Sequence, residues 1–109
     1  MARRASRLLV LNGERRVADR APVAIEADLR RPGRTSFRVL LRDLSRTGCK
    51  AETLSRVTLE ERVWITIPGF SAIDGVIRWV KRDCFGIEWE GRIHPAVFEH
   101  IRKHFPEAF

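Results

Sequence analysis

Apolar residues recur at every second position in the stretch that follows Pro22. The alternation is formed by Val23, Ile25, Ala27 and Leu29, with polar or small residues between them. Successive side chains of a β-strand point to opposite sides, so this period is typical of a strand with one buried face. The buried face needs other strands to cover it, and a chain of 109 residues has room for a single core.

Five further segments have the composition of short strands, and turn residues separate them. They span about residues 35–44, 49–52, 63–67, 73–80 and 85–89. Near the end of the chain Pro95 can begin a helix, whose apolar stripe consists of Val97, Phe98, Ile101 and Phe105. We therefore predict an all-β (mainly β) fold, a six-stranded antiparallel barrel with a C-terminal α-helix over one open end. Closure removes the strand edges that an open sheet of this size would expose.

Positive charge is concentrated near the N-terminus. The formal net charge is +7, and the first 20 residues hold six arginines against two acidic residues. The chain has far more arginine than lysine, and the planar arginine fork suits phosphate groups and guanine edges. Codon usage in a GC-rich genome gives the same ratio, so the ratio alone decides nothing. The charged N-terminus favours a polyanionic partner, which is a nucleic acid, a nucleotide or an anionic membrane surface.

Several functional classes lack support in the sequence. The apolar runs are far shorter than the roughly 20 residues that span a bilayer, so we expect no membrane insertion and a cytoplasmic location. Cys49 and Cys84 form no CxxC pair, and we expect free thiols. His100 and His104 stand one helical turn apart without further ligands at a sensible spacing, so no metal site and no cofactor are predicted. No Ser-His-Asp or Cys-His arrangement has supporting spacing, which predicts that the protein is not an enzyme.

Two short motifs stand on either side of the first predicted strand. Residues Arg16–Arg20 form an RxxxR motif, with Arg15 directly before it. Asp43, Ser45 and Gly48 form a DxSxxG motif where the second predicted strand ends. Either motif alone is common, because arginine is abundant here and acidic, serine and glycine residues are ordinary turn formers. Their order, and the strand between them, together resemble the PilZ family.

The resemblance covers about residues 14–89, including Phe85–Trp89, which looks like the last barrel strand of that family. It implies a six-stranded PilZ-like β-barrel that binds the bacterial second messenger cyclic di-GMP. We expect residues 1–13 to be a mobile basic N-terminal arm and residues 14–109 to be the PilZ-like domain. Within that domain the barrel would span about residues 20–90 and the helix about residues 95–105.

The chemistry of the motif residues agrees with this ligand. Arg16 and Arg20 can contact phosphates or bridge N7 and O6 of guanine, as arginine does in DNA recognition. Asp43 and the Ser45 hydroxyl offer acceptors for the guanine N–H edge. Gly48 would allow a positive φ in the turn and a close approach of the ligand to the backbone.

Two residues outside the motifs complete the candidate site. Trp79 shares its parity with Ile73 and Ile77, so it is either a core residue or a stacking platform for guanine at the barrel rim. In PilZ-like proteins an arginine before RxxxR goes with two intercalated ligand molecules, and Arg15 by that analogy favours a ligand pair. The predicted ligand-binding residues are Arg15, Arg16, Arg20, Asp43, Ser45, Gly48 and Trp79.

Two other functions are compatible with a small basic barrel. One is a module that binds single-stranded nucleic acid, but most aromatic residues share parity with aliphatic ones and RNP-type signatures are missing. No nucleic-acid partner is therefore expected. The other is a PilZ-like fold that has lost its ligand and serves as a protein adaptor, against which the intact motifs argue. The sequence does not identify the downstream protein that would receive the signal.

Overall fold

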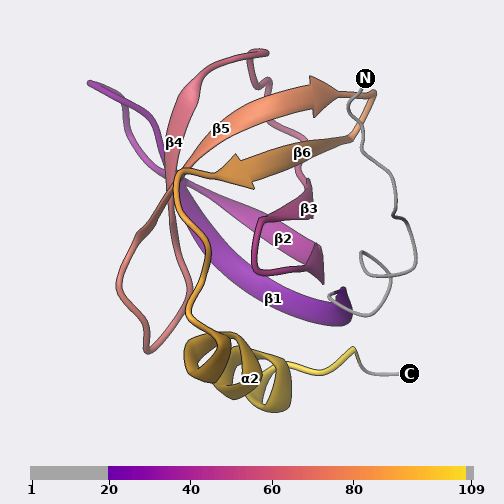
Figure 1. Ribbon diagram of the computed structural model, residues 1–109. Helices are drawn as coiled ribbons and strands as arrows, with labels where there is room; N and C mark the ends of the chain where they lie inside the picture. Colours follow the sequence, from indigo (N-terminus) through magenta and orange to yellow (C-terminus); the bar gives the residue numbers. More distant parts are fainter. Residues whose placement is uncertain (1–19, 108–109) are drawn as a thin grey trace, which may run out of the picture.

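The computed structural model describes residues 20–107, which form six strands and one helix (Figure 1). The elements are β1 (Ala21–Arg30), β2 (Phe37–Leu44), β3 (Gly48–Glu52), β4 (Arg62–Thr66), β5 (Ile73–Val80), β6 (Cys84–Trp89) and α2 (Pro95–His104). The strands close into an antiparallel barrel in the order β1-β2-β3-β6-β5-β4. The predicted fold is confirmed. Arg15, Arg16 and the expected arm of residues 1–13 lie outside the described residues.

The barrel interior holds the hydrophobic core. Every second residue of β1 is buried and the residues between them are exposed, which is the predicted alternation. The largest fully buried side chains include Phe85, Ile25, Leu29, Leu41, Leu44, Ile65, Ile67 and Ile77. Each such side chain contributes about 1.5–3 kcal/mol relative to an exposed one, so burial of these residues stabilises the barrel.

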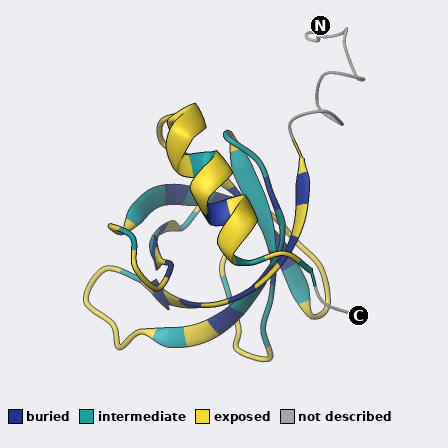
Figure 2. Cartoon of the chain, turned by 90° about the horizontal axis from the view of Figure 1, so that it is seen from below, coloured by how far each residue is buried: buried dark blue, intermediate teal, exposed yellow. Residues whose placement is uncertain are grey.

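Helix α2 lies across one end of the barrel (Figure 2). Ile101 on the inner face of α2 is fully buried, and Phe98 and Phe105 pack against the core. Val97 is 40% exposed, so the buried stripe is narrower than the sequence predicted. Beyond the helix the chain returns to β1, where the Ala24 N–H donates to the carbonyl oxygen of Phe105. This return fixes the helix against the first strand.

The strand pairing shifts register at three places. One lies on β1 between Pro22 and Ile25, one on β2 between Leu41 and Asp43, and one on β5 between Ile77 and Trp79. A bulge shifts the parity of the residues that follow it. Trp79 therefore leaves the interior face that Ile77 occupies, and it is 37% exposed on the outer surface. The core alternative for Trp79 is wrong, because parity from Ile77 does not carry through the bulge.

Candidate functional site

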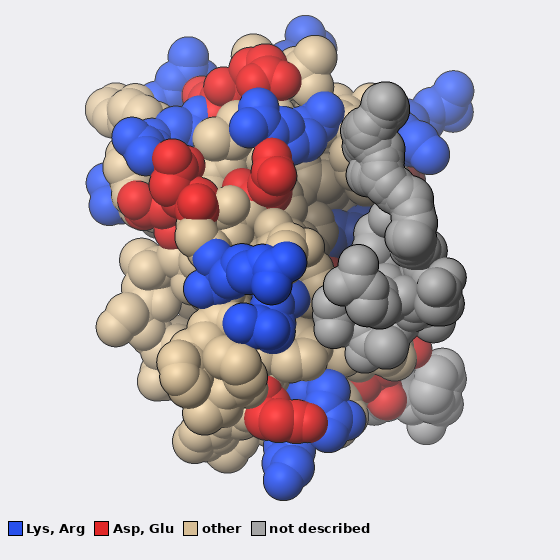
Figure 3. All heavy atoms as spheres, in the orientation of Figure 1, with Lys and Arg blue, Asp and Glu red and all other residues tan. Residues whose placement is uncertain are grey.

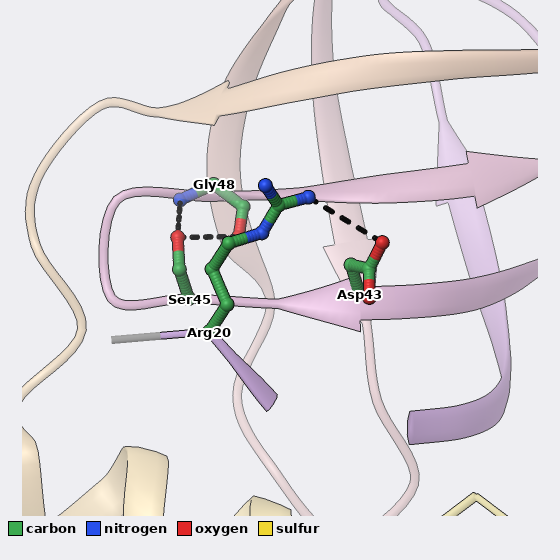
Figure 4. Close-up of polar contacts among 4 residues, drawn as sticks. All are labelled: Arg20, Asp43, Ser45 and Gly48. Atoms are coloured by element: carbon green, nitrogen blue, oxygen red, sulfur yellow. Dashed lines mark hydrogen bonds and ion pairs between the residues drawn. The ribbon is translucent and has the colours of Figure 1, made fainter. Parts of the chain in front are cut away.

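The DxSxxG turn between β2 and β3 is held by the side chain of Ser45 (Figure 4). The Ser45 N–H donates to the carbonyl oxygen of Gly48 at 2.8 Å. The Ser45 Oγ accepts from the N–H groups of Thr47 at 3.2 Å and Gly48 at 3.1 Å. The same hydroxyl lies within hydrogen-bond distance of the Gly48 carbonyl oxygen. The Ser45 hydroxyl is thus already engaged in shaping the turn.

The turn is also tied to the end of β6 and the segment beyond it. The Trp89 indole N–H donates to the carbonyl oxygen of Ser45 at 3.2 Å. The Trp89 backbone N–H donates to the carbonyl oxygen of Thr47 at 2.9 Å. Arg46 and Ile93 exchange two further bonds. The Ile93 N–H donates to the Arg46 carbonyl oxygen at 2.8 Å, and the Arg46 guanidinium donates to the Ile93 carbonyl oxygen at 2.9 Å. Because its backbone groups have partners, the turn is preorganised for a ligand.

Gly48 is required for a reason that the sequence did not predict. In the described part of the chain the glycines with positive φ are Gly33 and Gly69, so the predicted positive φ of Gly48 is wrong. A Cβ atom at Gly48 would collide with the carbonyl oxygen of Ile87 on β6. The glycine allows the first residue of β3 to lie close to the backbone of β6.

Arg20 and Asp43 meet at the start of β1 and the end of β2 (Figure 4). The Arg20 Nη2 lies 3.4 Å from the Asp43 Oδ2, and the two side chains are 56% and 37% exposed. An exposed ion pair of this kind contributes at most about 1 kcal/mol. Little free energy therefore holds Arg20 on Asp43, and either group can exchange this contact for a ligand.

A row of directly paired residues runs across four strands on the outer barrel surface. Asp43 on β2 pairs with Lys50 on β3, and Lys50 pairs with Gly86 on β6. Gly86 in turn pairs with Trp79 on β5. We call these four residues the cross-strand row. Three strand spacings of about 4.8 Å each place Trp79 about 14 Å from Asp43 along the surface.

Trp79 covers the backbone of Gly86 at the far end of this row. A Cβ atom at Gly86 would collide with three atoms of the indole, which include Nε1 and Cε2. The Lys81 ammonium lies 5.4 Å from the centroid of the indole ring. The row thus ends in an exposed aromatic side chain with a cation beside it, an arrangement that suits a nucleobase near a phosphate.

Lys50 is a candidate contact that sequence reasoning missed. It stands between Asp43 and Gly86 in register, and no ion pair involving it occurs among residues 20–107. In the structure it precedes the buried Ala51 on β3, so its side chain points outward. Its position next to Asp43 depends on the pairing of β2 with β3, which the sequence alone does not give.

The Cys49 thiol lies next to this surface and faces the core side of β3. Loss of solvent, and then the charge of Asp43, raise the pKa of Cys49 well above its ordinary value. The raised pKa keeps the thiol protonated at neutral pH, so Cys49 supplies no nucleophile or thiolate to the site.

On the face that Figure 3 shows, basic and acidic side chains are interspersed. Arg38 contacts Glu26 at 2.9 Å and Asp28 at 3.1 Å. Arg78 contacts Glu60 and Glu88, each at 2.7 Å. A barrel surface that tracks a nucleic-acid backbone needs a continuous positive groove, and these carboxylates interrupt it.

The fold and these contacts define a small antiparallel barrel that presents a preformed polar turn and an arginine–aspartate pair on its outer surface. Residues 14–105 match the PilZ domain, and the chain belongs to the PilZ family. PilZ domains as a family are ligand-binding receptor modules for cyclic di-GMP.

A solved structure with a similar fold is that of the Bacillus subtilis inhibitor of motility, MotI/DgrA. The two chains are 13% identical with a TM-score of 0.60, and the similarity covers 78% of this chain and 46% of that one. At this identity the likeness shows the fold alone, and this chain spans less than half the length of that protein. A search of curated proteins finds no relative.

Residues 20–107 lack the features of two other kinds of site. None of the helices there is long and apolar enough to cross a membrane. In the same residues no three or more His, Cys, Asp or Glu side chains are grouped so that they could hold a metal ion. The predicted Arg15 and Arg16 contacts are outside the described part of the chain and stay predictions.

Proposed function

We propose that this chain binds cyclic di-GMP on the outer barrel surface between the DxSxxG turn and Trp79, and that it catalyses no reaction. The observation that carries the proposal is the cross-strand row, which connects the motif residue Asp43 with the exposed indole of Trp79. The row spans about 14 Å, and in this proposal one ligand contacts both ends of it through its two guanines.

Each part of the ligand has a complementary group on this surface. A guanine stacked on Trp79 would contribute about 1–3 kcal/mol. The Asp43 carboxylate accepts from a guanine N–H edge, and a charged acceptor strengthens that bond. Lys50 and Arg20 supply positive charge for the phosphates, and Arg16 reads a phosphate or the N7 and O6 acceptors of a guanine.

Ser45 and Gly48 contribute through the shape of the turn. The Ser45 hydroxyl is engaged with the N–H groups of Thr47 and Gly48, so it supports binding by fixing the turn. Gly48 keeps the turn close to β6. The base-reading acceptor in this proposal is therefore Asp43.

Arg15 supports the binding of two intercalated ligand molecules rather than one. It precedes the RxxxR motif directly, so it can add a third guanidinium beside Arg16 and Arg20. Two stacked molecules present more phosphates than one and need more cations close by. The stoichiometry of a calorimetric titration distinguishes one molecule from two.

The signal leaves the protein, in this proposal, through ordering of residues 14–20. Without ligand the arginines there repel one another, and a bisphosphate ligand would neutralise them beside the turn. Fixing each backbone residue costs about 1–2 kcal/mol, which limits the ordered stretch to a few residues. The ordered segment and the bound nucleotide would together form a surface that a downstream protein reads.

Titration of the full chain with cyclic di-GMP, GTP and a short single-stranded oligonucleotide tests the proposed ligand. We expect saturable binding of cyclic di-GMP alone. Preferential binding of the oligonucleotide would favour the nucleic-acid module, and binding of none of the three would favour the adaptor. Amide hydrogen exchange then tests the ordering. Equal protection of residues 14–20 with and without cyclic di-GMP would show that these residues are no switch.

A further inference from the structure

A hollow of about 490 Å³ is lined in part by the β5–β6 hairpin. This hairpin lies toward the end of the barrel opposite α2 (Figure 1). The hollow lies between the chain that follows β3 (residues 53–57) and the β5–β6 hairpin (residues 80–85). We call it the hairpin hollow. The Thr53 N–H donates to the carbonyl oxygen of Asp83 at 3.1 Å, which ties its two walls together. The hollow is thus built from two connected segments rather than from one loose loop.

Exposed apolar side chains gather at this hollow. Leu54 is fully exposed and lines it, and Val80 is 41% exposed and lines it as well. Trp79, at 37% exposure, directly precedes Val80. Leu54 and Val80 are two of the five large hydrophobic side chains that are exposed in the described part of the chain, whereas Trp79 does not line the hollow. Exposed apolar side chains that cluster in this way mark an interaction surface more often than scattered ones do.

The charges around the hollow are unpaired. Arg56, Lys81 and Arg82 line it, and within residues 20–107 none of them lies within 4.0 Å of a carboxylate oxygen. Asp83 is the one acidic residue among those that line it. Elsewhere on the barrel, arginines such as Arg38 are paired with neighbouring carboxylates. The hollow therefore combines apolar contact area with free positive charge.

We propose that the hairpin hollow docks an acidic segment of a partner protein, with an apolar side chain of that segment placed against Leu54 and Val80. Carboxylates of the segment would pair with Arg56, Lys81 and Arg82. This pairing satisfies the free cations, and it gives orientation to a contact that the apolar side chains alone would leave non-specific.

Two other occupants fit these features less well. A nucleic acid would use aromatic side chains for stacking, whereas Leu54 and Val80 are aliphatic. A second copy of the chain, related by a two-fold axis through the hollow, would bring identical cations together. The apolar side chains and the unpaired positive charge therefore both favour a negatively charged protein segment as the occupant.

The hollow borders the proposed ligand surface. Trp79 belongs to the cross-strand row and adjoins the hollow through Val80 and through its contact with Lys81. If the proposed function holds, ligand on the row and a partner in the hollow would share one continuous surface. The docking itself does not rest on the proposed function.

Selection from a displayed library of random 12-residue peptides on the full chain tests the inference. We expect enriched peptides to carry acidic residues on both sides of Leu, Ile or Phe. An enriched peptide, labelled with fluorescein, should bind at least about tenfold more weakly to the Leu54→Ser/Arg82→Glu variant. The matched control, Val97→Ser/Lys103→Glu, changes an exposed apolar and an exposed basic residue on α2 and should bind like wild type. Thermal unfolding of both variants shows whether each is folded.

Four results would overturn the inference. They are failure to enrich acidic peptides, equal weakening by both double variants, competition by a single-stranded oligonucleotide, and sedimentation showing a dimer that Arg82→Glu alters. Cyclic di-GMP affinity, measured on the same variants, separates the two proposals because Leu54 and Arg82 lie outside the cross-strand row. A chain that binds the acidic peptide but not cyclic di-GMP would keep this inference and reject the proposed function.

Discussion

Asp43 and Trp79 lie on one cross-strand row of the outer barrel surface, and a β-bulge precedes each of them. Continued alternation from Leu41 and Ile77, which are buried, would turn both side chains inward. The bulges instead place a carboxylate and an indole outside the barrel while the strands stay paired. This is how the fold presents polar and aromatic groups together without opening its core.

Replacing Trp79 with alanine should weaken cyclic di-GMP binding by about 1–3 kcal/mol, because a stacking surface for guanine is lost. Trp64→Ala is the matched control, since Trp64 lies on β4, outside the row, and contacts Arg30. Equilibrium titrations of both variants check this. If Trp79→Ala binds like Trp64→Ala, the indole takes no part in the site.

Asp43→Ala should weaken cyclic di-GMP binding and reduce discrimination against cyclic di-AMP. The change removes the acceptor for a guanine N–H edge and leaves donors unpaired at about 1–3 kcal/mol each. A competition assay between the two dinucleotides measures the selectivity. Asp74→Ala, on β5 outside the row, should keep wild-type selectivity. Unchanged selectivity in Asp43→Ala would remove this residue from base reading.

Gly48→Ala should lower the free energy of unfolding by about 1–3 kcal/mol, because the added methyl group meets the backbone of β6. Gly91→Ala is a suitable control, since a Cβ atom there meets nothing within 4 Å and φ is not in the left-handed region. Urea denaturation of the two variants gives the comparison. Equal stability would show that β3 and β6 separate at little cost.

Cys49 should react slowly with iodoacetamide in the folded protein. Its pKa is raised by loss of solvent and by Asp43, so little thiolate forms at pH 8. Cys84 lines the hairpin hollow and should be labelled first.

The raised pKa of Cys49 also predicts that the free energy of unfolding falls at high pH. Above about pH 8.5 the unfolded chain releases the Cys49 proton while the folded chain retains it. Rapid labelling of Cys49 at denaturant concentrations below the unfolding midpoint would contradict the raised pKa.

The regular parts of the fold were predictable because they depend on local patterns. The alternation in β1 and the helix that begins at Pro95 both follow from the spacing of apolar residues. The two motifs were readable for the same reason, since each lies within six residues of chain. Short-range spacing therefore gave the elements and indicated where the site begins.

Non-local geometry accounts for what the sequence did not give. The position of Trp79 depends on a bulge, and bulges leave no clear periodic signal. Lys50 enters the site only through its pairing with Asp43, which requires the register of β2 against β3. The need for glycine at position 48 comes from Ile87, a residue of another strand. Each of these features belongs to a contact between strands.

Calorimetric titration of cyclic di-GMP into wild type, Arg16→Ala and Arg20→Ala tests the central claim most directly. Arg34→Ala is the matched control, because Arg34 is exposed in the turn between β1 and β2. We predict a loss of about 2–4 kcal/mol for each motif variant, with the fold retained and the control unchanged. Binding of either motif variant within about twofold of wild type would contradict the proposed site.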